Sequence, residues 1–306
     1  MKKTFHKLTQ HIFFGNYFVA LCAVALSIEA QVQQQLKPNT YLYYILLFSL
    51  TVLYYSKAYL LTDANPNLQN SRSIWYRENK SKIRVSMFVL IIVAVISVFY
   101  ILINYFSTIF FLETKIWLLM AAFPVFSILY YGVNFMDKTG VSLRRFGWLK
   151  PFVISMVWSG VVTIYPTIFY AISHNTKFQI ESTTILLFCK NFLFIAVLCI
   201  MFDIKDYAMD YNYQLKTFAV SLGLKKTIER VILPLCVASL GIYLLFSTTF
   251  QLHPFRIVFN TFPYIATIFV AIRLYRRKNI LYYLIIIDGL MLFKACCGIL
   301  GSLLFI

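Results

Sequence analysis

The chemistry most concentrated in this sequence is a stripe of three aspartates. The chain of 306 residues holds only six aspartates, and Asp203, Asp206 and Asp210 fall within eight positions of one another. If a helix continues past Asp203, the three side chains lie on one face, because residues three, four and seven apart share one side of a helix. Their oxygen ligands suit Mg²⁺, which typically binds one or two carboxylates together with substrate phosphates.

The same stripe also fits a second interpretation, a solvated helix end. Three carboxylates on one face repel one another, and Lys205 and Lys216 are near enough in the sequence to pair with them. Spacing alone therefore leaves open whether the stripe binds a cation or only caps a helix with charge.

Long apolar runs surround the stripe. The chain is 60% apolar and only 13% charged, whereas a soluble domain carries about 25% charged residues. Residues 85–104 and 231–252 contain no charged side chain, and a membrane-spanning helix needs about 20 apolar residues. The sequence predicts an all-α integral membrane protein, one domain over residues 1–306, with about nine transmembrane helices. We expect the spans near 11–30, 40–62, 84–106, 114–136, 150–173, 182–203, 231–251, 256–274 and 280–305.

Positive charge orients these spans. With the N-terminus in the cytoplasm, 21 lysines and arginines fall in the inside segments and four fall outside, as expected for membrane proteins. The C-terminus is then outside, and we expect a bacterial inner (plasma) membrane. The net charge of +17 does not indicate nucleic-acid binding, because the basic residues lie in short gaps between apolar runs. The first apolar run continues to about Ala30 without a cleavage site, which predicts an uncleaved helix.

The six cysteines lie within apolar runs without C-x-x-C pairs, and the four histidines are scattered. This pattern favours buried free thiols over a zinc site or a disulfide framework. Lys190, Asp288 and Lys294 fall deep in predicted spans, where charges usually face protein or water. We hypothesise that Lys190 pairs with Asp288.

A family resemblance extends the interpretation of the stripe. Residues 201–227 resemble the second aspartate motif of the UbiA superfamily of intramembrane prenyltransferases. The matching elements, in chain order, are Asp203, Asp206, Asp210, Lys216-Thr217 and Leu222-Gly223. Lys150 matches a basic residue near the start of the family's fifth helix. The predicted helix number and orientation also match, and the string ILLF recurs 18 residues before both Asp63 and Asp203. Asp63 and Asp203 follow predicted spans two and six, and this spacing of four helices suggests two four-helix repeats plus a ninth helix.

The first aspartate motif of the family is degenerate in this chain. Where the family has Asn, then Asp four and eight residues later, this sequence has Tyr55, Tyr59 and Asp63. The basic loop that follows is represented by Arg72 and Arg77 at a different spacing. Lys57 lies beside the degenerate motif, and either replaces part of the missing metal charge or extends to the membrane interface.

The resemblance implies an Mg²⁺-dependent enzyme that moves a prenyl group from a polyprenyl diphosphate to an aromatic or lipid-like acceptor within membrane lipids. Asp203, Asp206, Asp210 and Asp63 would hold the metal, and the first three would be catalytic. Tyr55 and Tyr59 would line the pocket. The diphosphate would be bound by Lys150, Arg72, Arg77 and Lys57. Two alternatives remain: a non-catalytic UbiA-like protein that binds isoprenoids or acts as an accessory subunit, and a membrane transporter.

Overall fold

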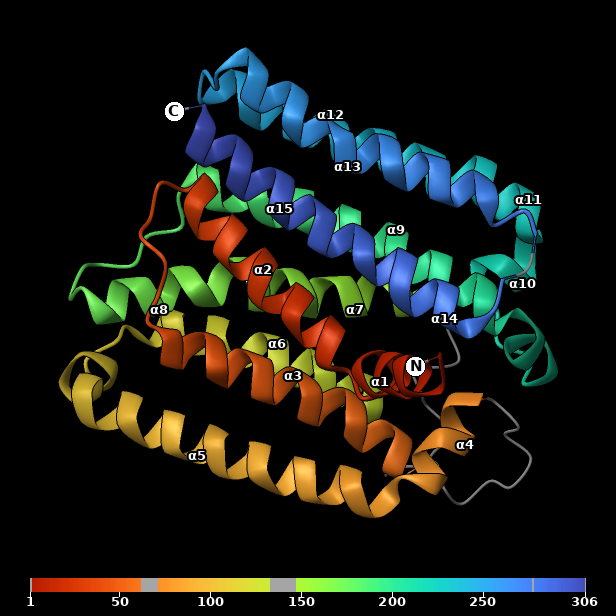
Figure 1. Ribbon diagram of the computed structural model, residues 1–306. Helices are drawn as coiled ribbons and strands as arrows, with labels where there is room; N and C mark the ends of the chain where they lie inside the picture. The colour runs from red at the N-terminus through yellow and green to blue at the C-terminus, as the bar shows by residue number, and fades with distance from the viewer. Residues whose placement is uncertain (1, 62–70, 133–146, 277, 306) are drawn as a thin grey trace.

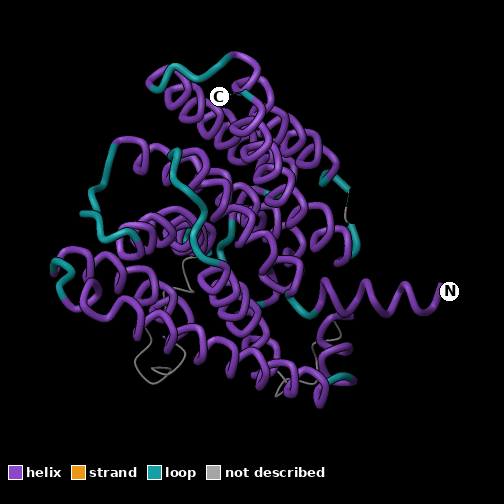
Figure 2. The backbone as a smooth tube through the Cα atoms, turned by 60° about the vertical axis from the view of Figure 1, so that its left-hand side comes forward, coloured by secondary structure: helices purple, strands orange, loops and turns teal. Residues whose placement is uncertain are grey.

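The computed structural model describes residues 2–61, 71–132, 147–276 and 278–305, and this part of the chain is helical throughout apart from its connections (Figures 1 and 2). The helices in chain order are α1 (Lys2–Phe14), α2 (Tyr17–Gln33), α3 (Tyr41–Leu61), α4 (Ser71–Glu78), α5 (Lys80–Phe110), α6 (Thr114–Gly132), α7 (Lys150–Ser159), α8 (Tyr165–Ser173), α9 (Ser182–Asn212), α10 (Phe218–Leu222), α11 (Leu224–Thr227), α12 (Leu233–Thr249), α13 (Pro254–Arg273), α14 (Ile280–Tyr282) and α15 (Asp288–Leu304). The absence of strands from this part confirms the all-α prediction.

Six continuous helical stretches of the described residues are long and apolar enough to cross a membrane, which is consistent with an all-α membrane protein. They are Lys80–Phe110, Lys150–Ser173, Ser182–Asn212, Leu224–Thr249, Pro254–Arg273 and Ile280–Leu304. Each of them begins or ends within a few residues of a predicted span. Leu224–Thr249 begins seven residues before the predicted start at 231, and Ser182–Asn212 ends nine residues after the predicted end at 203. The full count of nine spans stays a prediction.

The first predicted span, 11–30, is broken. Helices α1 and α2 meet at an angle of 53° across Gly15 and Asn16. Asn16 adopts a left-handed conformation with φ of 66°, which asparagine tolerates better than most residues. A Cβ on Gly15 would lie 2.7 Å from the ring of Tyr17, so the elbow also requires the small residue. Figure 2 shows α1 projecting from the helical body.

Three continuous spans contain one π-helical turn each, at Gly160–Ile164 between α7 and α8, Ile228–Ile232 before α12, and Tyr283–Ile287 before α15. Such turns interrupt the regular hydrogen bonding of an α-helix and occur often at functional positions. At the first turn the ring of Phe123 from α6 packs directly on Gly160, so a side chain there would separate the two helices.

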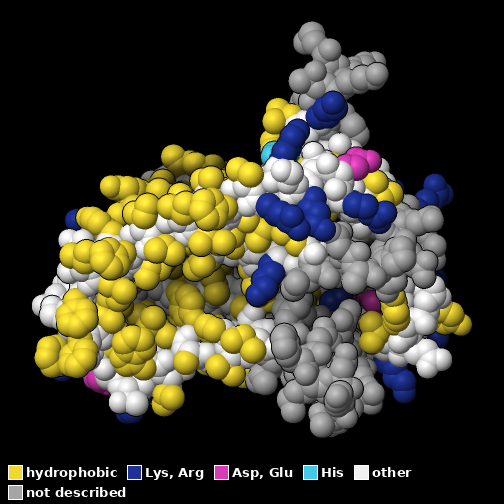
Figure 3. Space-filling view, turned by 90° about the horizontal axis from the view of Figure 1, so that it is seen from below, with side chains coloured by type: hydrophobic (Ala, Val, Ile, Leu, Met, Phe, Trp, Pro, Cys, Tyr) yellow, Lys and Arg dark blue, Asp and Glu magenta, His cyan; other side chains and the backbone are white. Residues whose placement is uncertain are grey.

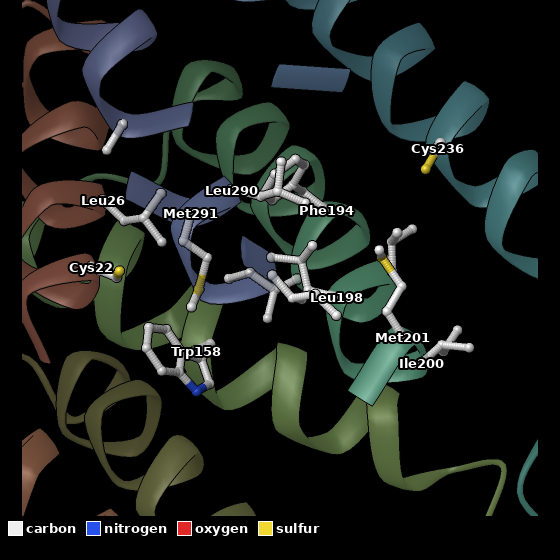
Figure 4. Close-up of a cluster of buried hydrophobic side chains, with 14 of the residues drawn as sticks. Cys22, Leu26, Trp158, Phe194, Leu198, Ile200, Met201, Cys236, Leu290 and Met291 are labelled. Atoms are coloured by element: carbon white, nitrogen blue, oxygen red, sulfur yellow. The ribbon is translucent and has the colours of Figure 1, made fainter. Parts of the chain in front are cut away.

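The core lies where α9 packs between α7 and α12, and where α2 packs against α15 (Figure 1). Figure 4 shows the apolar side chains that fill it, among them Leu26 of α2, Trp158 of α7 and Phe194 of α9. Helix α5 is different, because only 11% of its most apolar stretch is buried. Its apolar side chains cover one face of the molecule in Figure 3, while lysines and arginines gather toward one end.

This arrangement gives the bundle two ends, which we name by their residues (Figure 1). The aspartate end is where α9 finishes, beside α4, α10 and α14. The opposite end is where α8 and α15 finish and α13 begins.

Candidate functional site

Helix α9 carries the aspartate stripe without interruption. The helix runs from Ser182 to Asn212, which confirms that Asp203, Asp206 and Asp210 belong to one helix. Their environments differ: Asp203 is 1% exposed and Asp210 is 6% exposed, whereas the Asp206 side chain is 29% exposed. The stripe is therefore not a uniformly solvated helix end.

Asp203 is tied to the neighbouring helix by an ion pair. The Nζ of Lys150, the first residue of α7, lies 2.8 Å from Oδ1 of Asp203. The other carboxylate oxygen, Oδ2, is buried and accepts no hydrogen bond from the described residues. A buried acceptor in this state favours binding of a proton or a cation. The family resemblance predicted that Lys150 and Asp203 belong to one site, and the structure shows that they contact each other directly.

Asp206 pairs locally, with its Oδ1 3.3 Å from Nζ of Lys205. The Lys205 ammonium also lies 5.5 Å from the ring of Phe202. Because both partners of this pair reach solvent, the pair exchanges readily with another charged group. Asp206 is thus the most accessible carboxylate of the stripe.

The residues that follow the stripe shape the loop beside it. Thr217 caps α10, since its Oγ1 accepts a hydrogen bond from the N–H of Val220 at 3.4 Å. Gly223 has φ of 78°, a conformation that glycine adopts far more readily than other residues. A Cβ on Gly147 would lie 2.7 Å from the backbone N of Thr217, so the segment that leads into α7 packs closely on this loop. The Lys-Thr and Leu-Gly elements of the motif therefore have local structural causes.

The residues matched by resemblance to a degenerate first motif are only partly described: Tyr55 and Tyr59 lie on α3, and Asp63 lies outside the described residues. Tyr55 accepts a 2.7 Å hydrogen bond from Nε1 of Trp158 on α7. Tyr59 stacks on Tyr76 of α4 with ring centroids 4.9 Å apart. The two tyrosines thus contact different partners, one facing α7 and the other α4.

Arg72 is buried and holds the elbow between α1 and α2. Its guanidinium donates to the carbonyl of Phe14 at 3.0 Å, to Oδ1 of Asn16, and to the hydroxyl of Tyr59 at 3.0 Å. It also lies over the Tyr59 ring, 4.2 Å from the centroid. In this arrangement the guanidinium connects α4, α3 and the elbow.

Tyr76 shares this buried environment. Burial raises the pKa of its hydroxyl, while the nearby Arg72 charge acts in the other direction. The hydroxyl stays protonated at neutral pH and accepts a 2.9 Å hydrogen bond from Asn16. By contrast, Lys57 and Arg77 are exposed, so they do not join the buried side chains.

The charges deep in the bundle form a network that the sequence analysis did not anticipate. Glu29 of α2 is fully buried, with Oε1 3.1 Å from Nζ of Lys190 and Oε2 2.6 Å from Nζ of Lys294. The hypothesis that Lys190 pairs with Asp288 is therefore wrong. Glu29 lies at the end of the first predicted span, where a carboxylate is expected at the membrane interface. The polar residues Gln31 and Gln33 next to Glu29 were the sequence feature that could have indicated a buried polar network here.

Asp288 lies elsewhere, at the start of α15 after a π-helical turn. It is 6% exposed and lies within electrostatic range of Arg72 and Lys205. It therefore adds a buried carboxylate near the aspartate end, contributed by a helix that neither aspartate motif includes.

The carboxylates at the aspartate end restrict the kind of metal site that this end can form. In the part of the chain that the structure describes, no three His, Cys, Asp or Glu side chains are grouped closely enough to hold a metal. Asp206 is accessible and Asp203 has a buried oxygen without a hydrogen bond. These carboxylates fit an ion that binds together with phosphate oxygens, as Mg²⁺ often does.

Comparisons of the chain with protein-family models, with curated proteins and with solved structures find no match.

Proposed function

We propose that the protein is an intramembrane prenyltransferase of the UbiA type, which moves a prenyl group from a polyprenyl diphosphate to an aromatic or lipid-like acceptor. One observation carries the proposal: the three motif aspartates lie on one continuous helix, and Asp203 is paired at 2.8 Å with the Lys150 that the same resemblance selects. Two sequence elements about 50 residues apart, chosen independently of the structure, thereby meet at one site.

The fold proposed with this function has nine membrane spans, arranged as two four-helix repeats and a ninth helix. The aspartate end would face the cytoplasm of a bacterial inner membrane, with the N-terminus inside and the C-terminus outside. The asymmetry of lysines and arginines in the sequence supports this orientation. The basic side chains gathered toward one end in Figure 3 agree with it.

The reaction needs stabilisation of a leaving diphosphate. Asp206 and Asp210 would hold Mg²⁺ together with phosphate oxygens, with Asp203 and Asp63 beside them, and the bound ion would neutralise the negative charge that develops on the leaving group. Lys150 orients the Asp203 carboxylate through their contact. Positive charge at the aspartate end would favour the approach of an anionic headgroup. It is contributed by Arg72, Arg77 and Lys57.

The prenyl group needs a dry, electron-rich surface while positive charge develops on it. Tyr55 and Trp158 provide two aromatic rings with centroids 6.2 Å apart, and ring faces attract cations. Tyr59 would contribute less directly, because its ring is already covered by the Arg72 guanidinium.

The test uses purified protein with Mg²⁺ and a radiolabelled prenyl diphosphate, with diphosphate release as the readout. We expect release by the wild type and its loss in Asp206→Asn and Asp210→Asn. Glu229→Gln is the matched control, since Glu229 is exposed and its contacts, with Lys225 at 3.9 Å and with the Tyr275 hydroxyl at 3.1 Å, lie at the surface. Prenyl diphosphate binding without release in the wild type would instead support the non-catalytic alternative. If the wild type shows no binding and no release, the proposal is rejected.

The transporter alternative has one observation in its favour, the buried charges on Glu29, Lys190 and Lys294. Charged residues inside membrane proteins commonly mark transport pathways. Release of diphosphate from the labelled prenyl diphosphate by the wild type would argue against transport as the main activity. The same assay therefore separates the prenyltransferase proposal from the transporter alternative.

A further inference from the structure

The buried charges toward the opposite end of the bundle form a network that the proposed function does not use. Glu29 and Gln33 of α2, Lys190 and Asn191 of α9, and Lys294 of α15 are each at most 4% exposed. Asn191 accepts from Lys294 at 2.7 Å and donates to Thr163 at 2.8 Å, within the π-helical turn that follows α7. The network therefore joins four spans of the chain through hydrogen bonds.

The helices approach one another closely around this network. A Cβ on Gly298 of α15 would lie 2.7 Å from Oε1 of Glu29 and 2.8 Å from Nε2 of Gln33. A Cβ on Gly301 would lie 2.9 Å from Nδ2 of Asn260. The two glycines thus allow α2 and α13 to bring their polar side chains against α15.

Arg256 extends the network toward the opposite end. It lies in the first turn of α13, and its backbone carbonyl accepts hydrogen bonds from Asn260 at 3.0 Å and Tyr243 at 3.2 Å. Asn260 in turn accepts from Gln33 at 3.2 Å. The Arg256 charge is close enough to act on Lys190 and Tyr243.

The charges of this network do not balance. Its described members include the three cations Lys190, Lys294 and Arg256, and one carboxylate, Glu29. A buried lysine can lose its proton, but the guanidinium of an arginine stays charged in proteins. Glu29 already contacts both lysines, so even with one lysine neutral the charge of Arg256 needs a counter-charge. A buried charge without one is strongly unfavourable.

The donor atoms of Arg256 indicate what kind of counter-charge fits. Arg256 is 6% exposed, and its Nε and Nη2 are buried without a hydrogen-bond partner among the described residues. These two nitrogens form one edge of the guanidinium, and their parallel N–H bonds match the two oxygens of a carboxylate or phosphate. The first turn of a 20-residue helix adds positive potential at the same place.

We propose that the protein binds an oxyanion, a carboxylate or phosphate group, on the Nε and Nη2 edge of Arg256 at the start of α13. Two sources can supply this group: a free anion, or the phosphate of a lipid headgroup, since Arg256 is the third residue of a membrane span. The site lies toward the end of the bundle opposite the aspartates and does not depend on prenyl transfer.

The test uses full-length protein in dodecyl maltoside without phosphate, and follows the thermal unfolding midpoint. One arm adds inorganic phosphate or acetate, with chloride at the same ionic strength as reference. The other arm adds phosphatidylglycerol. We expect a saturable rise of the midpoint in at least one arm, and the responding arm identifies the source of the oxyanion.

The variants decide whether Arg256 is responsible. In Arg256→Gln we expect the half-saturating concentration to rise by about tenfold or more, because a bidentate charged contact is lost. Arg273→Gln is the matched control, since Arg273 is exposed at the other end of the same helix, and it should respond as the wild type does. No response of the wild type in either arm, or an equal response in Arg256→Gln, overturns the proposal.

Arg256→Lys covers the case in which Arg256→Gln does not fold. Lysine keeps the charge but has no paired N–H edge, so we expect a response weaker than that of the wild type. A response of Arg256→Lys equal to that of the wild type would overturn bidentate recognition by the guanidinium.

Discussion

The substitution Glu29→Gln tests the physical basis of the buried network most directly. Gln has nearly the size of Glu but no charge, and Glu29 is the carboxylate between Lys190 and Lys294. Its oxygens accept from both ammonium groups and from Gln33 at 2.8 Å. The change therefore removes the counter-charge of two buried lysines while leaving the packing almost intact.

The expected destabilisation follows from the burial of all three partners. Removing one member of a buried ion pair typically costs about 3–5 kcal/mol, because the remaining charge is left uncompensated. Glu29 is 0% exposed and packs against Gly298, so water has little room to replace the carboxylate. At about 2 °C per kcal/mol for a large chain, we expect the unfolding midpoint to fall by about 6 °C or more.

The buried cysteines provide the assay. Cys296 is exposed, so every variant also carries Cys296→Ser. Cys22 is 0% exposed and Cys236 is 2% exposed, and a thiol-reactive dye therefore reacts with them when the detergent-solubilised protein unfolds. Glu113→Gln is the matched control, because Glu113 is exposed, and we expect its midpoint to stay within about 1 °C of the wild type, since surface substitutions rarely change stability.

A double substitution shows whether charge is the cause. If Glu29 acts by balancing the lysines, adding Lys294→Met to Glu29→Gln removes one of the two uncompensated charges. The double variant should then be more stable than the sum of the single effects by about 1–3 kcal/mol. An additive result within about 0.5 kcal/mol, or an unchanged midpoint in Glu29→Gln, would refute the reasoning.

Three further predictions concern the aspartate end and its supports. Lys150→Met leaves the buried Asp203 without its ion pair and should lower stability by about 2 kcal/mol, less than for a fully buried pair because Lys150 is 29% exposed; Lys150→Met combined with Asp203→Asn should recover part of this loss in the same dye assay. Gly223→Ala should destabilise by about 1 kcal/mol because φ is 78°, whereas Gly241→Ala, also facing open space but within α12, should stabilise slightly. Arg72→Gln should increase hydrogen exchange at the α1–α2 elbow, because the contacts to Phe14 and Asn16 are lost.

Each of these predictions has an outcome that contradicts it. A Lys150→Met variant as stable as the wild type would mean that the Asp203 carboxylate is already neutral. If Gly223→Ala and Gly241→Ala change the stability in the same direction, the positive φ at Gly223 does not limit which residue fits there. For Arg72→Gln the control is Arg77→Gln, since Arg77 is exposed on the same helix. Equal hydrogen exchange at the elbow in both variants would mean that Arg72 does not hold the elbow.

The apolar runs were sufficient to predict most of the helices, because a membrane span is a local property of sequence. The spans near 150–173, 256–274 and 280–305 agree with helical stretches within a few residues. The break at Gly15 and Asn16 was missed, because both residues fit within an otherwise apolar run. In the structure, the left-handed Asn16 forms the break and the buried contacts of Arg72 hold it.

The partners of buried charges were harder to predict, because a charge pair across helices is a property of packing. The resemblance brought Lys150 and Asp203 to one site, since both occur in a known pattern. For Lys190 there was no pattern, and the nearest apparent choice, Asp288, was wrong. The actual partner, Glu29, is 161 positions away, and no feature of sequence spacing connects the two.

Helix α9 links these two kinds of buried charge. Lys190 and Asp203 are 13 residues apart on it, about 20 Å along the helix axis. Each charge is stabilised by a different helix, Asp203 by α7 and Lys190 by α2. Since both partners contact α9 from fixed positions, the two ion pairs together restrict the rotation of α9 about its axis. The direction in which the aspartate stripe faces is therefore set partly by a network at the far half of the same helix, in which none of the three aspartates takes part.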